Sequence, residues 1–160
     1  MPAPTVAIVG RSGSGKTTII EGLIGELARR GYRVATVKHT HHGFEIDKVG
    51  KDSWRHRKAG ASPVVITSKG HLAIIMDVDR EPSLIELRDR FLSGVDIVLA
   101  EGFRGEEVPK VEVLSRGEVP SASHLIALVG EESLSAPIPA FKPQQVKELA
   151  DLIEQRFLKG

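Results

Sequence analysis

The most informative pattern in this chain is Gly10-Arg11-Ser12-Gly13-Ser14-Gly15-Lys16-Thr17. It has the form Gly-x-x-x-x-Gly-Lys-Thr, which is typical of a loop that wraps around phosphate groups. The glycines let backbone N–H groups converge on phosphate oxygens, and the following helix adds the positive end of its dipole. Such a loop needs a strand before it and a helix after it. A β-branched run at residues 5–9 and apolar residues at helical spacing from 19 to 28 supply both.

The loop predicts a set of contacts with a nucleotide and its metal ion. We expect Lys16 to reach the β- and γ-phosphates and Thr17 to offer its hydroxyl to Mg²⁺. A magnesium nucleotide site also needs an acidic residue at the carboxyl end of a neighbouring buried strand. Glu101 directly follows a buried-type strand at residues 95–100, so we predict Thr17 and Glu101 at the metal. The predicted phosphate-binding residues are Gly10, Arg11, Ser12, Gly13, Ser14, Gly15, Lys16, Thr17 and Thr18.

The segments around the loop predict an α/β fold. A second strand at residues 33–38 follows the first helix, and this order of elements implies that the two strands run parallel. Residues 64–67 and 72–78 are apolar runs separated by Ser68-Lys69-Gly70-His71, which suits an antiparallel hairpin within the sheet. Ser83 and Glu86 have the spacing of a capping box at the start of a helix.

Further elements complete this prediction. We expect a short polar helix at residues 51–59, strands at residues 110–114 and 125–129, and a closing amphipathic helix from 146 to 157. The result is a P-loop NTPase fold of three layers, with a mostly parallel central sheet and an antiparallel hairpin. Without repeats or a recognisable linker, we expect one domain over residues 1–160.

Composition excludes several classes of function. The 22 basic and 21 acidic residues nearly balance and aromatic residues make up only 4%, so we do not expect nucleic acid as a partner. The chain has no cysteine, which removes disulfides, thiolate zinc sites and cysteine nucleophiles and fits the cytoplasm. No apolar segment is long enough to suggest a membrane partner or a secretion signal.

Polar residues after the second strand give less specific signals. His39, His41 and His42 could bind a transition metal, contact phosphate or act as acid and base groups. Asp47 and Asp52 are candidates for a further carboxylate near the metal, with Asp47 preferred, although helix capping explains either residue equally well. The basic run at residues 55–58 could meet an anionic ligand or form a solvated helix face.

Several strings beyond the loop resemble one known family. They are Val34-Ala35-Thr36-Val37-Lys38-His39-Thr40-His41-His42, Phe44-Glu45-Ile46-Asp47, Gly50-Lys51-Asp52-Ser53, Arg57-Lys58-Ala59-Gly60-Ala61, Glu101-Gly102-Phe103-Arg104 and Pro109-Lys110-Val111-Glu112-Val113. Together with the loop, they resemble the MobB-type molybdopterin-guanine dinucleotide biosynthesis adapter proteins. The resemblance covers most of the chain up to the strand at residues 110–114.

This resemblance implies a GTP-binding protein, usually a homodimer, that assists a guanylyltransferase in attaching GMP to molybdopterin. It implies weak GTP hydrolysis at most, and it leaves open whether molybdopterin or molybdoenzyme maturation partners bind directly. Carried over by position, it assigns residues 10–17 to the GTP phosphates, Glu101 to the Mg²⁺ region, and Lys38, His39 and Asp47 to the adjoining pocket. No Asn-Lys-x-Asp motif reads guanine, and Val129-Gly130-Glu131 is only a positional candidate.

Two other functions stay open at this point. A nickel-delivery GTPase is suggested by histidines near a phosphate loop, and uptake of Ni²⁺ or Zn²⁺ lost in His41→Ala would favour it. A small-molecule kinase needs an acceptor pocket near the γ-phosphate, and phosphoryl transfer to small acceptors would favour it.

Overall fold

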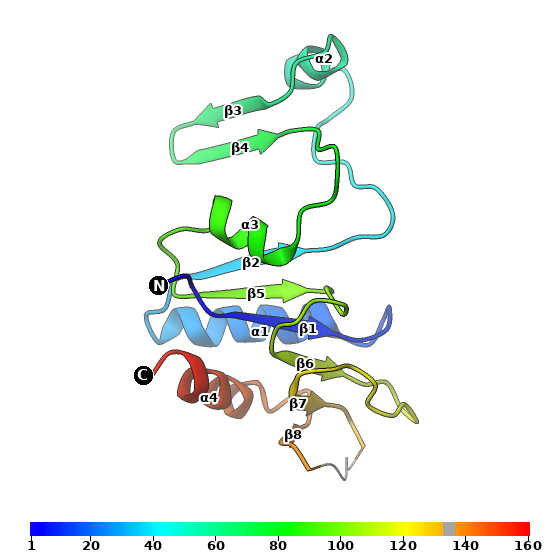
Figure 1. Ribbon diagram of the computed structural model, residues 1–160, viewed down its shortest axis with the longest axis vertical. Coiled ribbons are helices and arrows are strands. Elements are labelled where there is room, and N and C mark those ends of the chain that lie inside the picture. Colours follow the sequence, from blue (N-terminus) through cyan, green and yellow to red (C-terminus); the bar gives the residue numbers. More distant parts are fainter. Residues whose placement is uncertain (133–136) are drawn as a thin grey trace. The chain divides into compact units, whose positions relative to one another are not determined.

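The structure is a computed structural model that describes residues 1–132 and 137–160. The chain divides into two compact units. The sheet unit comprises Met1–His39 and Ser83–Gly160, and the hairpin unit comprises Thr40–Pro82 (Figure 1). The expectation of one domain over the whole chain stays a prediction.

A parallel β-sheet forms the centre of the sheet unit. Its strands run in the order β2-β5-β1-β6-β7-β8, and every pairing described is parallel (Figure 1). The strands are β1 (Thr5–Val9), β2 (Val34–Lys38), β5 (Ile97–Glu101), β6 (Lys110–Val113), β7 (Leu125–Val129) and β8 (Ala140–Phe141). The predicted strands are confirmed with small shifts at their ends, whereas the two-residue β8 carries too little pattern to be predicted.

Strand β1 occupies the middle of this sheet. The chain passes from β1 to β2 on the β5 side and later to β6 on the opposite side. Ligands of open α/β sheets bind at the carboxyl ends of the strands where the direction of connection reverses in this way. The loop after β1 therefore lies at the position that the topology favours for a ligand.

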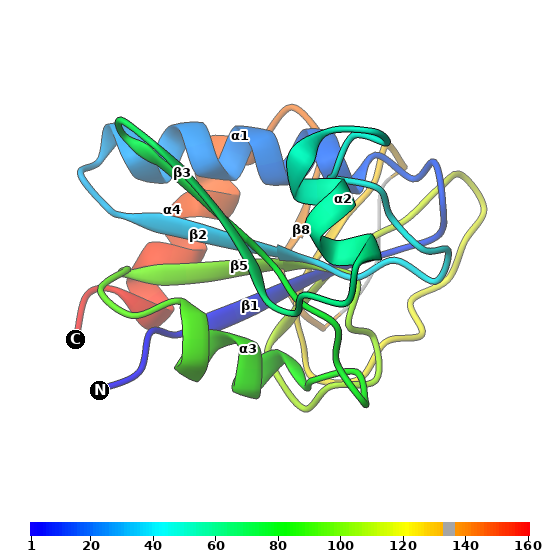
Figure 2. The same cartoon turned by 90° about the horizontal axis from the view of Figure 1, so that it is seen from above.

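Helices cover both faces of the sheet. Strand side chains alternate between the faces, so Ile8 packs in one apolar cluster with α1 (Lys16–Arg29) and α4 (Val146–Phe157). Ala7 and Val9 pack in a second cluster with Leu84 of α3 (Leu84–Phe91). Figure 2 shows α1 and α3 on opposite sides of the sheet. The three-layer α/β architecture is thus confirmed.

The start of α3 confirms the predicted capping box. The Glu86 backbone N–H donates to Ser83 Oγ at 3.2 Å, and the Ser83 N–H donates to Glu86 Oε2 at 2.8 Å. These reciprocal bonds satisfy two backbone donors that a helix start leaves without partners.

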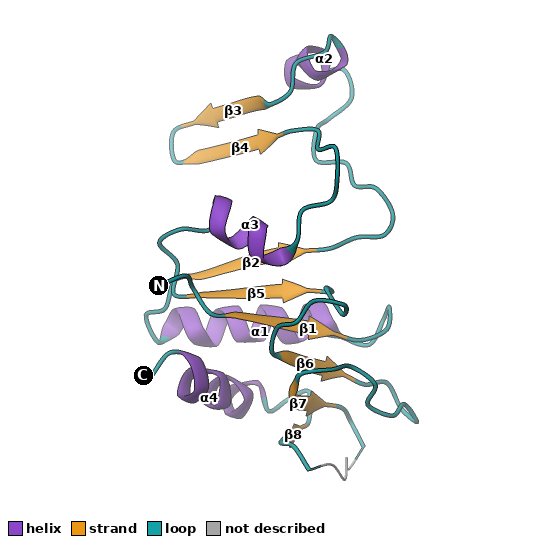
Figure 3. Cartoon of the chain, viewed as in Figure 1, coloured by secondary structure: helices purple, strands orange, loops and turns teal. Residues whose placement is uncertain are grey.

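The hairpin unit contains α2 (Asp52–Lys58) and the antiparallel strands β3 (Val64–Ser68) and β4 (His71–Ile75), as Figure 3 shows. The predicted hairpin and polar helix are both confirmed. However, the strand pair forms a sheet of its own, so the expectation that it lies within the central sheet was wrong. The sequence pattern identifies a hairpin through its turn residues. It does not specify whether the hairpin pairs with the edge of another sheet.

Candidate nucleotide-binding site

The loop between β1 and α1 requires its glycines. A Cβ atom on Gly10 would lie 2.4 Å from the Val113 carbonyl oxygen and 2.6 Å from Ser14 Oγ, so a side chain cannot fit without displacing backbone. Gly13 and Gly15 have φ angles of +76° and +96°, in the left-handed region that glycine adopts at little cost. The loop therefore turns tightly enough to present its backbone to a ligand.

The N-terminus of α1 is open to an anion. Gly15 occupies the N-cap position, and among the described residues no side chain caps it and no acidic residue lies in the first turn. The first backbone N–H groups of a helix have no acceptor within the helix and carry a partial positive charge. Ser14 Oγ is also buried without a hydrogen-bond partner in the described part of the chain. These donors and this hydroxyl fit the oxygen atoms of a phosphate chain.

Lys16 extends over the same loop. Its Nζ atom donates to the Gly10 carbonyl oxygen at 2.9 Å and to the Arg11 carbonyl oxygen at 2.7 Å. The ammonium group thus lies against the loop that would surround the phosphates. Phosphate oxygens can replace these neutral carbonyl acceptors with a stronger, charge-assisted interaction.

Thr17 and Glu101, predicted to share a metal ion, lie close together. Thr17 Oγ1 is 3.4 Å from Glu101 Oε1 and 3.5 Å from Oε2, although the residues are 84 positions apart. The contact arises because Glu101 ends β5, directly beside β1. A hydroxyl and a carboxylate are ligands of the kind that Mg²⁺ takes from proteins, together with phosphate oxygens and water. The donor set fits a magnesium ion.

Lys38 and His39 also belong to this edge of the sheet. Lys38 pairs with Glu101 in the β2–β5 register, and its Nζ lies 3.4 Å from Glu101 Oε1. The His39 N–H donates to the Glu101 carbonyl oxygen at 3.0 Å. The His39 ring lies 5.4 Å from the Phe103 ring, measured between centroids. Two of the three residues predicted for the adjoining pocket, Lys38 and His39, therefore lie beside the Thr17–Glu101 pair.

Asp47 and Asp52 lie in the hairpin unit. Asp47 Oδ1 accepts a hydrogen bond from Ser53 Oγ at 2.8 Å, whereas its Oδ2 is buried and has no hydrogen-bond partner among residues 1–132 and 137–160. Asp52 is the first residue of α2, where a carboxylate interacts favourably with the helix dipole. Local structure thus explains Asp52, while the second oxygen of Asp47 has no donor among the described residues.

Among the residues that the structure describes, the histidine-rich segment belongs to no group of three or more histidine, cysteine, aspartate or glutamate side chains placed to hold a metal ion. His41 and His42 lie in an exposed part of the hairpin unit.

Among the described helices, none is long and apolar enough to cross a membrane.

Sequence reasoning missed a buried carboxylate next to the loop. Glu112 is 1% exposed and accepts hydrogen bonds from Arg104 Nη2 at 2.6 Å, the Ser121 N–H at 2.9 Å and the Ala122 N–H at 3.1 Å. Burial alone raises the pKa of Glu112, but the two backbone donors and Arg104 together hold that pKa below its ordinary value. The signal in the sequence was a carboxylate between two valines in the strand Lys110-Val111-Glu112-Val113.

A second missed contact fastens the phosphate loop to the connection between β6 and β7. Arg11 Nε forms an ion pair with Glu118 Oε1 at 2.6 Å, and Glu118 Oε2 accepts from the Ser115 N–H at 2.6 Å. Farther along this edge, Glu131 follows β7 and accepts a hydrogen bond from Gln144 Nε2 at 3.3 Å. The positional candidate for contact with the base is therefore at the carboxyl edge of the sheet.

The chain is similar to known proteins over most of its length. Residues 5–131 match the family MobB, molybdopterin guanine dinucleotide synthesis protein B. The molybdopterin-guanine dinucleotide biosynthesis adapter protein of Haemophilus influenzae is 37% identical over 157 residues, covering 94% of this chain and 88% of the relative. The adapter protein of the same name from Escherichia coli is 35% identical, covering 98% of this chain and 94% of the relative.

Solved structures agree with these sequence matches. The crystal structure of Bacillus subtilis MobB has a TM-score of 0.81 at 28% identity and covers 98% of this chain and 99% of the other. A second crystal structure, of molybdopterin-guanine biosynthesis protein B, has a TM-score of 0.76 at 31% identity, with 94% of this chain and 97% of the other covered. The similarity thus extends to the whole fold, including the hairpin unit.

Proposed function

Because this chain belongs to the MobB family, described as molybdopterin guanine dinucleotide synthesis protein B, we propose that it is an adapter that holds GTP and Mg²⁺ for a guanylyltransferase. The partner enzyme would attach GMP to molybdopterin to form the dinucleotide that gives the relatives their name. Family membership supports this adapter function rather than nickel delivery or the phosphorylation of a small molecule.

The observation that carries the proposal is the contact between Thr17 and Glu101 beside the open N-terminus of α1. Backbone N–H groups of the loop and the first turn bind the phosphates, and Lys16 turns from the Gly10 and Arg11 carbonyls to the β- and γ-phosphates. Thr17 and Glu101 hold Mg²⁺, which neutralises phosphate charge. Lys38 lies next to Glu101 and adds positive charge on the same side.

In this proposal the nucleotide is held and presented, and hydrolysis is slow at most. A tightly shaped loop and a metal site suffice to bind Mg-GTP, and the transferase supplies the chemistry of guanylyl transfer. GTP is a cytoplasmic metabolite and the chain contains no cysteine, so we place the adapter in the cytoplasm.

We also propose that the adapter is a homodimer in which the hairpin contacts a second copy. Val65, Leu72 and Ile74 lie on one face of the hairpin, and they are 55%, 66% and 49% exposed. An isolated two-stranded sheet is only marginally stable in water, and its outer edges can pair with another strand. The hairpin of a second copy would supply apolar side chains to cover this face and a strand to pair with this edge.

Calorimetry tests the nucleotide site. Wild-type protein with Mg²⁺ should bind GTP, Lys16→Ala should bind at least about tenfold more weakly because it loses a charge-assisted contact, and Lys69→Ala at the hairpin turn should bind as wild type does. Equal affinity of all three proteins would refute phosphate binding at the loop. Guanylyl transfer reconstituted with and without the adapter then tests its assistance to the enzyme.

Measuring the oligomeric state tests the proposed dimer. Leu72→Lys and Ile74→Lys place charge on the apolar hairpin face, and each should convert the dimer to a monomer in analytical ultracentrifugation. Val119→Lys is the control, since Val119 is 77% exposed but belongs to the sheet unit. A wild-type protein that sediments as a monomer at all concentrations contradicts the dimer and leaves GTP binding untouched.

A further inference from the structure

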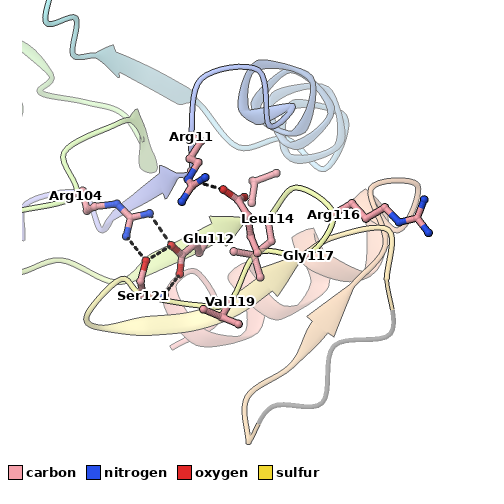
Figure 4. A pocket seen from close by; sticks show the side chains of 11 residues that line it. Arg11, Arg104, Glu112, Leu114, Arg116, Gly117, Val119 and Ser121 are labelled. Atoms are coloured by element: carbon pink, nitrogen blue, oxygen red, sulfur yellow. Dashed lines mark hydrogen bonds and ion pairs between the residues drawn. The ribbon is translucent and has the colours of Figure 1, made fainter.

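A cavity of about 390 Å³ lies at the carboxyl ends of β1 and β6 (Figure 4). Gly10 and Arg11 of the phosphate loop form one border of the cavity, and Val113, Leu114 and Val119 contribute apolar lining. Its volume falls in the range of small-molecule sites, about 300–1,000 Å³, and exceeds what a bare ion needs. It lies on the β6 side of β1, whereas the Thr17–Glu101 pair lies on the β5 side. The cavity is therefore distinct from the metal site.

Arg104 is held in a fixed orientation at one wall of this cavity. Its Nη2 donates to the buried Glu112 at 2.6 Å, and its Nη1 donates to Ser121 Oγ at 3.0 Å. Both contacts are drawn in Figure 4. The side chain is nevertheless 44% exposed, and a guanidinium has five N–H donors, so Arg104 can bind a further acceptor. Glu112 acts as the positioning residue because it fixes the guanidinium before any ligand arrives.

Arg11 reaches the cavity from the phosphate loop. Its ion pair with Glu118 spans 2.6 Å, but the Arg11 side chain is 80% exposed, so water screens the pair. A phosphate dianion can compete with the Glu118 carboxylate and accept two hydrogen bonds from the same guanidinium. Arg116 also lines the cavity, but its guanidinium extends away from Arg11 and Arg104 (Figure 4). Two arginines from different loops thus converge on the cavity, next to an apolar surface.

We propose that this cavity binds a phosphate monoester. Its phosphate contacts Arg11 and Arg104, and its organic part covers the apolar lining at Val113, Leu114 and Val119. The biological meaning rests on the proposed function: an adapter for guanylyl transfer to a phosphorylated acceptor would hold that acceptor beside the nucleotide. The binding chemistry itself does not depend on GTP.

Phenyl phosphate is a suitable probe, with phenol and inorganic phosphate as controls for its two halves. The probe is titrated into ¹⁵N-labelled protein saturated with Mg²⁺ and a non-hydrolysable GTP analogue, so that the phosphate loop is already filled. The expected result is a saturable shift of the amide signals of Glu112, Ser121 and Ala122. Phenyl phosphate should bind more tightly than inorganic phosphate, and phenol should bind least.

Two variants and one control test the assignment. Arg104→Lys keeps the charge opposite Glu112, and Arg11→Gln alters an exposed side chain, so both should fold, as thermal unfolding can verify. Each should weaken phenyl phosphate binding by about tenfold or more, the usual consequence of losing a charge-assisted hydrogen bond. Arg116→Gln removes the same charge from a side chain that points away, and it should change the affinity by less than about twofold.

Three results would overturn the proposal: no shift of these amides, unchanged affinity in both variants, or an equal loss in Arg116→Gln. Repeating the titration with Lys16→Ala without nucleotide separates this proposal from GTP binding. Lys16 does not line the cavity, so phenyl phosphate should bind this variant with wild-type affinity. Loss of GTP binding with retained phenyl phosphate binding leaves the cavity proposal intact. A wild-type protein that binds GTP but not phenyl phosphate refutes the cavity proposal alone.

Discussion

Replacing Glu112 by glutamine should destabilise the protein by about 3 kcal/mol. Both carboxylate oxygens accept: Oε1 from Arg104 Nη2 and Ser121 Oγ, and Oε2 from the backbone N–H groups of Ser121 and Ala122. Glutamine offers only one acceptor oxygen, so its NH₂ group must face either the backbone donors or the guanidinium. Breaking a buried ion pair costs about 3–5 kcal/mol. We expect the lower end because Arg104 is 44% exposed and can turn to water.

The loss should depend on pH, and its sign follows from the lowered pKa of Glu112. Burial raises that pKa, but the N–H groups of Ala122 and Ser121 and the Arg104 side chain lower it by more. Folding therefore favours the ionised carboxylate, and this stabilisation is fully present above the unfolded pKa, about 4.3. As the pH falls through the lower pKa of the folded state, wild type loses this contribution. The stability gap between wild type and Glu112→Gln should then narrow.

Urea unfolding at a series of pH values from about 7 down to 3 measures this gap. Glu45→Gln is the control, because Glu45 is exposed and its replacement should change the free energy of unfolding by less than about 0.5 kcal/mol. The reasoning is refuted if Glu112→Gln is as stable as wild type near neutral pH. A gap that stays constant down to about pH 3 would refute the role assigned to the carboxylate charge.

Further predictions concern the loop, the metal and a helix start. Gly10→Ala should abolish nucleotide binding and destabilise by about 3 kcal/mol, because its Cβ would meet the Val113 carbonyl oxygen at 2.4 Å. Gly13→Ala is its control, since a Cβ on Gly13 meets nothing within 4 Å. Only the left-handed φ angle then destabilises this variant, by about 1–2 kcal/mol. Equal losses of unfolding free energy in the two variants, measured by urea unfolding, would contradict the steric argument. Glu101→Gln should leave GTP affinity without Mg²⁺ nearly unchanged and remove most of the gain that Mg²⁺ gives, as calorimetry with and without the ion can measure. Ser83→Ala should lower the free energy of unfolding by about 1 kcal/mol through loss of the α3 cap, and an unchanged urea midpoint would argue against the capping box.

Local sequence patterns predicted much of the fold and part of the site. The glycine-lysine-threonine loop, the Ser83 capping box and the hairpin turn each depend on residues within a few positions of one another. Their conformations follow from neighbouring backbone and side-chain chemistry, so a single sequence contains the information. The placement of Glu101 near Thr17 was also predictable, because the carboxyl ends of parallel strands meet at one edge of a sheet.

Tertiary structure alone decided the rest. The burial of Glu112 against Arg104 depends on how two loops close over β6, and the Arg11–Glu118 pair joins segments that are far apart in sequence. The separate sheet of the hairpin unit likewise depends on which edge a strand pair joins. Periodicity and turn residues specify which segments become strands and helices. Strand order, register and loop conformation specify which distant side chains meet, and these depend on packing across the whole chain.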